Sequence, residues 1–237
     1  MEPKSRVLIF GATGSIGSAI AEWFLNHDWD VSSVSRSDNI PVHSSAIKKI
    51  VWDPFVSDDW QSDTEQVPFN AIVWAQGKNF NDSIYTFNSS NHEEMYRANV
   101  TYILKTLHKL LLDNLLCKPS RLCILSSIWQ NIARQNKLSY TVSKAAIQGL
   151  VQSLAIDLGK DGHLVNAVLP GALDTPMTRA NLNKEQMQVL ESATPLGNLA
   201  TLDDVCNLIG FLCSCENTGI TSQFIAADRG FTNARIL

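Results

Sequence analysis

Residues 6–17 read RVLIFGATGSIG, and this stretch decides the fold. A short apolar strand, Arg6 to Phe10, runs directly into a turn with Gly11, Gly14 and Gly17, and an apolar helical pattern follows at once. Glycines let the backbone turn sharply, and the amino end of a helix offers free N–H groups and a partial positive charge to an anion. The stretch therefore predicts a strand, turn and helix that bind the pyrophosphate of a dinucleotide.

The rest of the chain repeats this alternation of short β-branched runs and longer helical stretches, which is typical of βαβ units. Strands are expected near Arg6–Phe10, Asp30–Ser35, Lys48–Trp52, Ala71–Trp74, Arg121–Ser126, Leu164–Leu169 and Gln223–Ala227. Helices are expected near Ser15–His27, Asn91–Leu116, Tyr140–Leu158, Lys184–Ala193 and Leu202–Cys213, with a short polar helix within Asp53–Pro68. We predict a single α/β domain over residues 1–237: a Rossmann-like, doubly wound, seven-stranded parallel sheet with helices on both faces.

Amino-acid composition limits which binding partners and which cellular compartment are expected. The charged fraction is 18%, and the net charge of −4 gives no electrostatic attraction to nucleic acid or to an anionic membrane. Only four apolar residues in a row precede Gly11, and no run approaches the roughly 20 residues of a membrane span, so a cytoplasmic protein is expected. The histidines show no metal-ligand spacing, and reduced thiols are expected at Cys117, Cys123, Cys206, Cys213 and Cys215.

The end of the second predicted strand indicates which dinucleotide binds. An Asp or Glu there would bind the adenosine ribose of NAD, but the sequence reads Val34-Ser35-Arg36-Ser37. A guanidinium makes paired, charge-assisted bonds to a 2′-phosphate, so Arg36, helped by Ser35 and Ser37, favours NADP (NADPH) over NAD. Asp53, after the third strand, either accepts a bond from the adenine amino group or begins a turn before Pro54.

A second group of residues predicts proton transfer. Tyr140 and Lys144 are four residues apart at the start of a helix, so their side chains share one face. A free phenol has a pKa of about 10, and a neighbouring cation favours the phenolate by lowering that pKa. Ser127 ends the fifth predicted strand, where its hydroxyl can bond a substrate oxygen.

On these residues the chain resembles the short-chain dehydrogenase/reductase family, specifically the shorter single-domain branch that includes ketoacyl-carrier-protein reductases and hydroxysteroid dehydrogenases. The resemblance runs from Arg6 to Thr232 and is carried by several motifs together. Beside the glycine turn these are Asp53, Asn99, Ser126-Ser127, Tyr140-Thr141-Val142-Ser143-Lys144, Asn166 before Pro170-Gly171, Thr175-Pro176-Met177 and Asp228-Arg229-Gly230-Phe231.

The resemblance implies an NADP-dependent oxidoreductase that moves a hydride between nicotinamide and a carbonyl or secondary alcohol. It implies that Tyr140 is the general acid/base, that Lys144 lowers its pKa and holds the nicotinamide ribose, that Ser127 stabilises the substrate oxygen, and that Asn99 positions a water. The implied cofactor contacts are Gly11, Thr13, Gly14, Ser15, Ile16, Gly17, Ser35, Arg36, Ser37, Asp53, Gln76, Gly77, Tyr140, Lys144, Pro170, Gly171 and Thr175.

Some positions depart from the family pattern. Ser15 stands where a glycine is usual, and the spacing of Gly11, Gly14 and Gly17 is that of the larger, sugar-nucleotide-modifying branch, although a second substrate domain is not expected here. An epimerase or dehydratase that retains its cofactor is therefore one alternative. A non-catalytic NADP-binding sensor is another, disfavoured because all four chemical residues are present. Trp74-Ala75-Gln76-Gly77 replaces Asn-Asn-Ala-Gly, with Gln76 as a partial substitute, and Arg229 replaces a glycine near subunit contacts of the family.

The remaining expectations concern substrate and assembly. Residues 173–195 are a candidate lid over the site, because they follow the carboxyl end of the sixth strand. The substrate is expected to be a small carbonyl or alcohol, and an anionic one if two of the nearby cations face the cleft: Arg134, Lys137, Arg179 and Lys184. A homotetramer or homodimer is expected through the two long helices, on whose apolar faces lie Leu107, Leu110, Leu111, Leu150 and Leu154.

Overall fold

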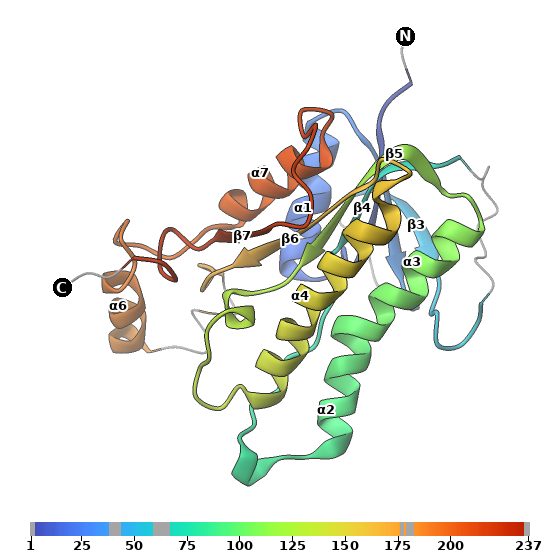
Figure 1. Cartoon of the computed structure of the whole chain (residues 1–237). Helices are drawn as coiled ribbons and strands as arrows, with labels where there is room; N and C mark the ends of the chain where they lie inside the picture. The colour runs from blue at the N-terminus through green and yellow to red at the C-terminus, as the bar shows by residue number, and fades with distance from the viewer. Residues whose placement is uncertain (1–2, 38–43, 59–66, 176–177, 179–182, 235–237) are drawn as a thin grey trace.

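A computed structural model describes residues 3–37, 44–58, 67–175, 178 and 183–234 of the chain (Figure 1). Seven parallel strands form one sheet in the order β3-β2-β1-β4-β5-β6-β7. Their bounds are β1 Arg6–Phe10, β2 Asp30–Ser35, β3 Lys48–Val51, β4 Phe69–Trp74, β5 Leu116–Leu125, β6 Leu164–Pro170 and β7 Phe224–Ala227. The predicted Rossmann-like, doubly wound sheet is confirmed.

Helices cover both faces of the sheet (Figure 1). One face carries α1 (Ser15–Asn26) and α7 (Leu202–Cys213), and the other carries α4 (Leu138–Gly159) beside the run of α2 (Ser89–Tyr96), the π-helical segment η2 (Arg97–Thr101) and α3 (Tyr102–Leu112). The remaining helix, α6 (Lys184–Ser192), stands away from the sheet beside the C-terminal segment. The short polar helix expected within Asp53–Pro68 falls largely on residues 59–66, outside the described residues.

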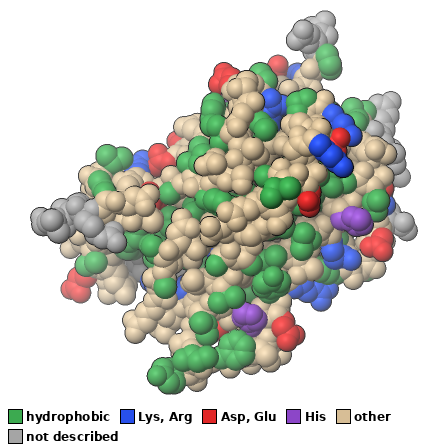
Figure 2. All heavy atoms as spheres, viewed as in Figure 1, with side chains coloured by type: hydrophobic (Ala, Val, Ile, Leu, Met, Phe, Trp, Pro, Cys, Tyr) green, Lys and Arg blue, Asp and Glu red, His purple; other side chains and the backbone are tan. Residues whose placement is uncertain are grey.

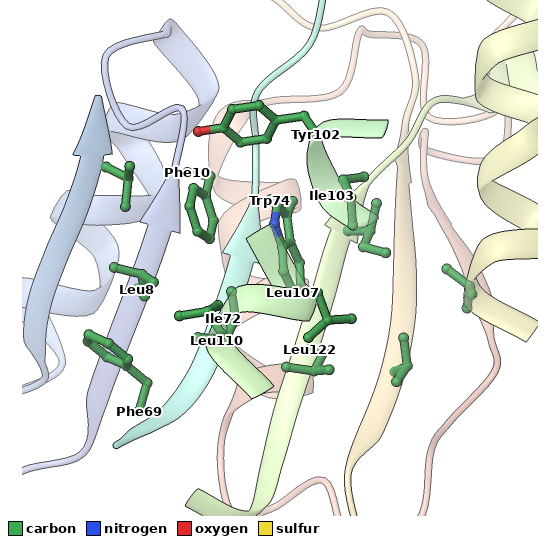
Figure 3. Packing of buried hydrophobic residues seen from close by; sticks show 14 of the residues in the cluster. Leu8, Phe10, Phe69, Ile72, Trp74, Tyr102, Ile103, Leu107, Leu110 and Leu122 are labelled. Carbon is green, nitrogen blue, oxygen red and sulfur yellow. The ribbon is translucent and has the colours of Figure 1, made fainter. Parts of the chain in front are cut away.

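Alternation along each strand divides the core in two. Leu8 and Phe10 of β1 point to the α3 and α4 side, while Val7 and Ile9 point to the α1 and α7 side. On the first side Phe10 stacks on Trp74 with ring centroids 5.8 Å apart, and Tyr102 lies edge-on across Phe10 at the same distance (Figure 3). These buried aromatic rings anchor the carboxyl ends of β1 and β4 to the helix that follows β4.

The helix predicted over Asn91–Leu116 begins and ends at other residues in the structure. It begins at Ser89, because the Asn88 side chain accepts the Asn91 N–H, and it ends at Leu112. Asn114 then takes a left-handed conformation with φ of 55°, and Leu116 already belongs to β5. The apolar run of leucines therefore continues across a helix end that periodicity alone does not reveal.

The apolar faces of α3 and α4 are also packed against the core to a greater extent than expected. Leu107 and Leu110 are fully buried in the core, and Leu111, Leu150 and Leu154 pack against it, so these leucines do not form the free face that was expected. The large apolar residues that α3 and α4 do expose are Leu104, Leu112, Val142 and Ile156. The expected homodimer or homotetramer stays a prediction.

The surface agrees with the charge balance. On the face in Figure 2, acidic and basic side chains are interspersed without an extended basic area. Within the described ranges, no helix is long and apolar enough to cross a membrane, and no group of His, Cys, Asp or Glu could hold a metal ion. All five cysteines are free thiols; Cys123, Cys206 and Cys213 are buried, Cys117 is partly buried and Cys215 is exposed.

Close backbone contacts explain the glycines of the first turn. Gly11 has a φ of +86°, and a Cβ there would lie 2.6 Å from the backbone nitrogen of Gln76. A Cβ on Gly17 would lie 2.1 Å from the carbonyl oxygen of Gly11. Gly14 is the N-cap residue of α1, and its N–H donates to the Gly11 oxygen at 3.1 Å. The turn is tight because α1 sits directly on it, which only glycine at position 17 permits.

We predict that Gly17→Ala lowers the free energy of unfolding by about 1–3 kcal/mol, because the added methyl group has no room beside the Gly11 carbonyl. Urea denaturation of wild type and variant measures this difference. Gly149→Ala is the matched control, since Gly149 lies within α4 with no heavy atom within 4 Å of an added Cβ. It should raise stability by about 0.5–1 kcal/mol through helix propensity. Equal stability of Gly17→Ala and wild type would contradict the packing argument.

Candidate active site

The parallel sheet brings the candidate residues to one edge. Gly11 follows β1, Arg36 follows β2, Gln76 follows β4, Ser127 follows β5 and Gly171 follows β6. Because all the strands run in the same direction, these residues lie at the carboxyl edge, where ligands bind in open α/β sheets. The structure therefore brings together the two groups of residues that the sequence separates.

Tyr140 lies in the first turn of α4, and Lys144 follows one turn later on the same face. The Lys144 ammonium is buried and lies 5.7 Å from the centroid of the Tyr140 ring, and it donates a hydrogen bond to the Leu125 carbonyl at 2.9 Å. Ser127, also buried, hydrogen-bonds with the Tyr140 side chain. Three of the predicted chemical residues thus meet where β5 ends and α4 begins.

Burial controls the ionisation of this group. Burial raises the pKa of Tyr140, and the hydrogen bond with Ser127 lowers it by less, so the net shift is upward. Burial also lowers the pKa of Lys144 to about 8. The sequence predicts a Tyr140 pKa lowered by Lys144, and the net direction is the opposite because desolvation of the phenolate outweighs the favourable contacts. At neutral pH Tyr140 therefore holds its proton.

Asn99 is buried inside the π-helical segment η2. Its side-chain oxygen accepts the Lys78 N–H at 2.8 Å, and its amide donates to the Lys78 carbonyl and the Ser143 hydroxyl at 3.0 and 2.9 Å. A Cβ on Gly77 would lie 2.9 Å from Asn99 Oδ1 and 3.9 Å from Lys144 Nζ. Gly77, in the segment after β4, thus lies against the Asn99 side chain and near the Lys144 ammonium. π-Helical turns occur often at functional sites.

Two observations fit a dinucleotide beside this group. Both polar atoms of the Gln76 side-chain amide are buried with no hydrogen-bond partner among the described residues, next to Gly11. The amino end of α1 has no side-chain cap, so its first N–H groups remain available to an anion. Thr13 and Ser15 border this end, Ser15 exposed, and Ile16 packs on the core behind it.

The ends of β2 and β3 form the side expected to hold the adenosine. Arg36 and Ser37 are exposed, whereas the buried Ser35 hydroxyl donates to the Ser37 carbonyl at 2.9 Å, so its only proton is used within the turn. Asp53 was expected either to contact the adenine or to begin a turn before Pro54, and it does begin a turn: its carboxylate accepts the Phe55 N–H at 2.9 Å. The second oxygen of that carboxylate is not used in this bond.

Sequence reasoning missed Tyr102 at this side of the site. Its ring lies across Phe10 at the top of the sheet (Figure 3). Burial and the nearby Asp53 carboxylate raise the pKa of Tyr102, while Arg36 lowers it, so the phenol lies within electrostatic reach of both charged groups. Its position three residues after Asn99, one turn along the same helical run, is the signal that could have found it.

The sixth strand ends in Pro170, which pairs with Ala227 of β7. Gly171 donates to the Ala227 carbonyl at 3.1 Å, and a Cβ on Gly171 would lie 2.8 Å from that of Asp228. Thr175 is buried and hydrogen-bonds Thr178 through the two hydroxyls at 3.1 Å. Pro176, Met177 and Arg179 lie outside the described residues, so only part of the candidate lid is described.

A cavity of about 490 Å³, open to solvent, has Trp129 in its wall, two residues after Ser127. The Trp129 N–H donates to Ser127 Oγ at 3.3 Å, so a residue that lines the cavity is hydrogen-bonded to one of the chemical residues. The lining residues are Trp129, Ile132, Ala133, Arg134, Ala193, Phe231 and Ala234. Among the described residues of the candidate lid, Ala193, at the C-cap of α6, lines the cavity.

One of the expected cations lines this cavity. Arg134 lines it, with its guanidinium 5.8 Å from the centroid of the Trp129 ring. Lys137 lies 5.7 Å from the centroid of the Tyr140 ring, and burial and Arg134 lower its pKa. Lys184 is exposed at the start of α6. The unusual Arg229 has a structural partner, the Asp204 carboxylate of the α7 capping box, at 2.7 Å.

Comparison with known proteins agrees with this geometry. Residues 66–232 match the family model described as enoyl-(acyl carrier protein) reductase. The chain is 26% identical to the 3-oxoacyl-[acyl-carrier-protein] reductase MabA of Mycobacterium tuberculosis, over 94% of this chain and 91% of MabA. It is 32% identical to the L-rhamnose 1-dehydrogenase (NADP(+)) of Thermoplasma acidophilum, but over only 58% of this chain and 55% of that enzyme.

A solved structure extends the similarity to the whole chain. The short chain dehydrogenase family protein from Francisella tularensis superposes with a TM-score of 0.83 at 25% identity, covering 98% of this chain and all of that one. With its seven-stranded sheet, its glycine turn and the grouping of Ser127, Tyr140 and Lys144, the chain belongs to the short-chain dehydrogenase/reductase family of oxidoreductases.

Proposed function

We propose that the protein is an NADP-dependent oxidoreductase that moves a hydride between nicotinamide and a carbonyl or secondary alcohol, with Tyr140 as general acid/base. The observation that carries the proposal is the meeting of Ser127, Tyr140, Lys144 and Asn99 at the carboxyl edge, beside a glycine turn that fits a dinucleotide. A sensor without catalytic activity would not need this grouping.

Each residue has a role that its contacts support. NADP supplies the hydride acceptor or donor, and the protein supplies orientation and a proton. Tyr140 holds that proton at neutral pH and donates it to the carbonyl oxygen during reduction, while the Ser127 hydroxyl bonds the same oxygen. One of the three N–H groups of the Lys144 ammonium donates to the Leu125 carbonyl, and the other two can donate to the ribose of the nicotinamide. Asn99 positions a water for the proton's return.

The dinucleotide contacts proposed are those of the glycine turn with Thr13, Ser15 and Ile16, together with Gln76 and Gly77. Asp53 faces the adenine, Ser35 and Ser37 shape the turn that presents Arg36 to the 2′-phosphate, and Pro170, Gly171 and Thr175 orient the nicotinamide carboxamide.

The chemistry of the cavity favours an apolar, acidic substrate. Apart from Arg134, every lining side chain named above is apolar or carries only the indole N–H, so the lining offers few hydrogen-bond partners to the hydroxyls of a sugar. Arg134, with Lys137 close by, suits a carboxylate at one end of an apolar carbonyl compound. The lining thus disfavours the alternative of a sugar-modifying enzyme.

We predict that Tyr140→Phe lowers kcat by about 10²–10⁴-fold, because the proton donor is lost. Ser127→Ala should lower kcat and also move the pH dependence of alcohol oxidation. Oxidation needs the deprotonated Tyr140, and removal of a bond that lowers its pKa raises that pKa, so the rising limb shifts to higher pH. Steady-state rates across the neutral and alkaline range measure both effects. Tyr85→Phe, at a fully exposed tyrosine, is the control, and an unchanged limb in Ser127→Ala would refute the role of Ser127.

Arg36→Ala should weaken NADPH binding by about 10- to 100-fold and leave NADH binding unchanged, because a charge-assisted bond to the 2′-phosphate is worth about 1.5–3 kcal/mol. Titration followed by nicotinamide fluorescence measures both affinities. Lys160→Ala removes an exposed cation after α4, at the opposite edge of the sheet, and should change neither. Equal loss for both nucleotides in Arg36→Ala would argue against a phosphate contact.

Arg134→Ala should raise KM for an apolar oxo acid about two- to fivefold, because an ion pair with an exposed guanidinium is lost. The corresponding methyl ester has the same shape without the charge and should be reduced equally well by wild type and variant. Kinetics with this substrate pair separate charge recognition from packing. A matching rise of KM for the ester would show that Arg134 acts only by packing on Trp129.

A further inference from the structure

The amino end of α4, which carries Tyr140, has no cap of its own. The N-cap residue Lys137 makes no side-chain bond to the helix, although the first N–H groups of a helix lack partners within it. Asp82, from the loop after β4, supplies one: its Oδ1 accepts the Ser139 N–H at 3.0 Å across 57 positions of sequence. This capping contact holds the residue immediately before Tyr140.

The side chain of Ser139 completes a network with the buried Asp82 and the partly buried His92. Its hydroxyl donates to Asp82 Oδ2 at 2.5 Å and lies 2.8 Å from His92 Nδ1. An ionised carboxylate can only accept, so the hydroxyl proton goes to Asp82 and His92 donates from Nδ1. Ser139 is completely buried and Asp82 nearly so, which excludes a Ser139 nucleophile that reaches a substrate.

Backbone contacts fix the same loop against the approach to α4. The Asp82 N–H donates to the Asn136 carbonyl, and the Leu138 N–H donates to the Asp82 carbonyl, both at 3.2 Å. Lys137 Nζ donates to Asn79 Oδ1 at 2.7 Å. The positive end of α4 and the Lys137 charge offset the burial of the Asp82 carboxylate, and a hydrogen-bonded network with a buried carboxylate at its centre restrains the groups that it joins.

A second anchor lies four residues further along. The Asn99 amide donates to Ser143 Oγ at 2.9 Å, and Ser143 Oγ donates to the Tyr140 carbonyl at 2.8 Å. The turn that carries Tyr140 is therefore held at Ser139 by Asp82 and at Ser143 by Asn99. His92 and Asn99 both belong to the helical run of α2 and η2. This run and the loop after β4 therefore both hydrogen-bond to the first turns of α4.

We propose that Asp82 is a positioning residue for the reaction: through Ser139 and His92 it fixes the first turn of α4, and hence the distance between the Tyr140 hydroxyl and Ser127. The inference rests on the proposed function, because it concerns the placement of the proposed acid/base. A displacement of about 1 Å in a catalytic group can cost about 10²-fold in rate.

The test compares Asp82→Ala, Asp82→Asn and Ser139→Ala with wild type. Asp82→Ala should lower kcat at least about tenfold and leave the affinity and stoichiometry of NADPH binding unchanged, because the dinucleotide contacts are untouched. Asp82→Asn keeps an acceptor for the Ser139 N–H and should recover part of the loss. Both variants lack the carboxylate charge, so a rising limb of the oxidation pH profile at higher pH in Asp82→Ala than in Asp82→Asn reports a weakened Tyr140 to Ser127 bond.

Hydrogen exchange supplies a readout that does not depend on turnover. Amides of residues 139–143 should exchange faster in Asp82→Ala and in Ser139→Ala, whereas Asp203→Ala, which removes an exposed carboxylate from the first turn of α7, should change neither exchange in α4 nor kcat. Wild-type exchange and turnover in Asp82→Ala would overturn the proposal, as would a joint fall of kcat, NADPH stoichiometry and thermal stability. If wild-type protein turns over no carbonyl compound but exchange still responds to Asp82, the proposed function fails while the anchoring of α4 stands.

Discussion

Parallel pairing of the strands is the constraint on which the rest of the structure depends. Phe10 pairs with Trp74, and Trp74 pairs with Ile124, so the residues that follow β1, β4 and β5 come to one edge from positions more than a hundred residues apart. Such a sheet is stable only if both faces are buried, and the two apolar clusters provide that burial. The same parallel pairing that lets helices cover both faces of the sheet therefore also gathers the candidate site residues at the carboxyl edge.

Burial then determines the chemistry at that edge. The ammonium of Lys144 and the phenol of Tyr140 are both removed from water, which makes the charged form of each less favourable. The phenol is therefore neutral at neutral pH, which is the form that the proposed reduction needs as a proton donor. The hydrogen bond with Ser127 lowers the pKa of Tyr140 by less than burial raises it, so the two effects oppose each other at the proposed acid/base.

Backbone proximity is as important as side-chain identity in this site. Gly11 fits against Gln76, Gly17 against Gly11, and Gly77 against the Asn99 side chain. Each of these glycines marks a place where two segments approach more closely than a Cβ allows. The departure from the family pattern at Ser15 does not disturb this arrangement, because Ser15 is exposed in the first turn of α1 while Gly14 and Gly17 make the close turn.

The sequence by itself determined the alternation of strands and helices, the glycine turn and the pairing of Tyr140 with Lys144, because strand and helix periodicity and close backbone turns are properties of neighbouring residues. It misplaced the end of the helix before β5, since an unbroken run of leucines crosses that boundary. Only the tertiary structure decided the direction of the Tyr140 pKa, the apolar lining beside Arg134 and the capping of α4 by Asp82. Desolvation and contacts between distant segments arise when the whole chain packs, and no local pattern encodes them.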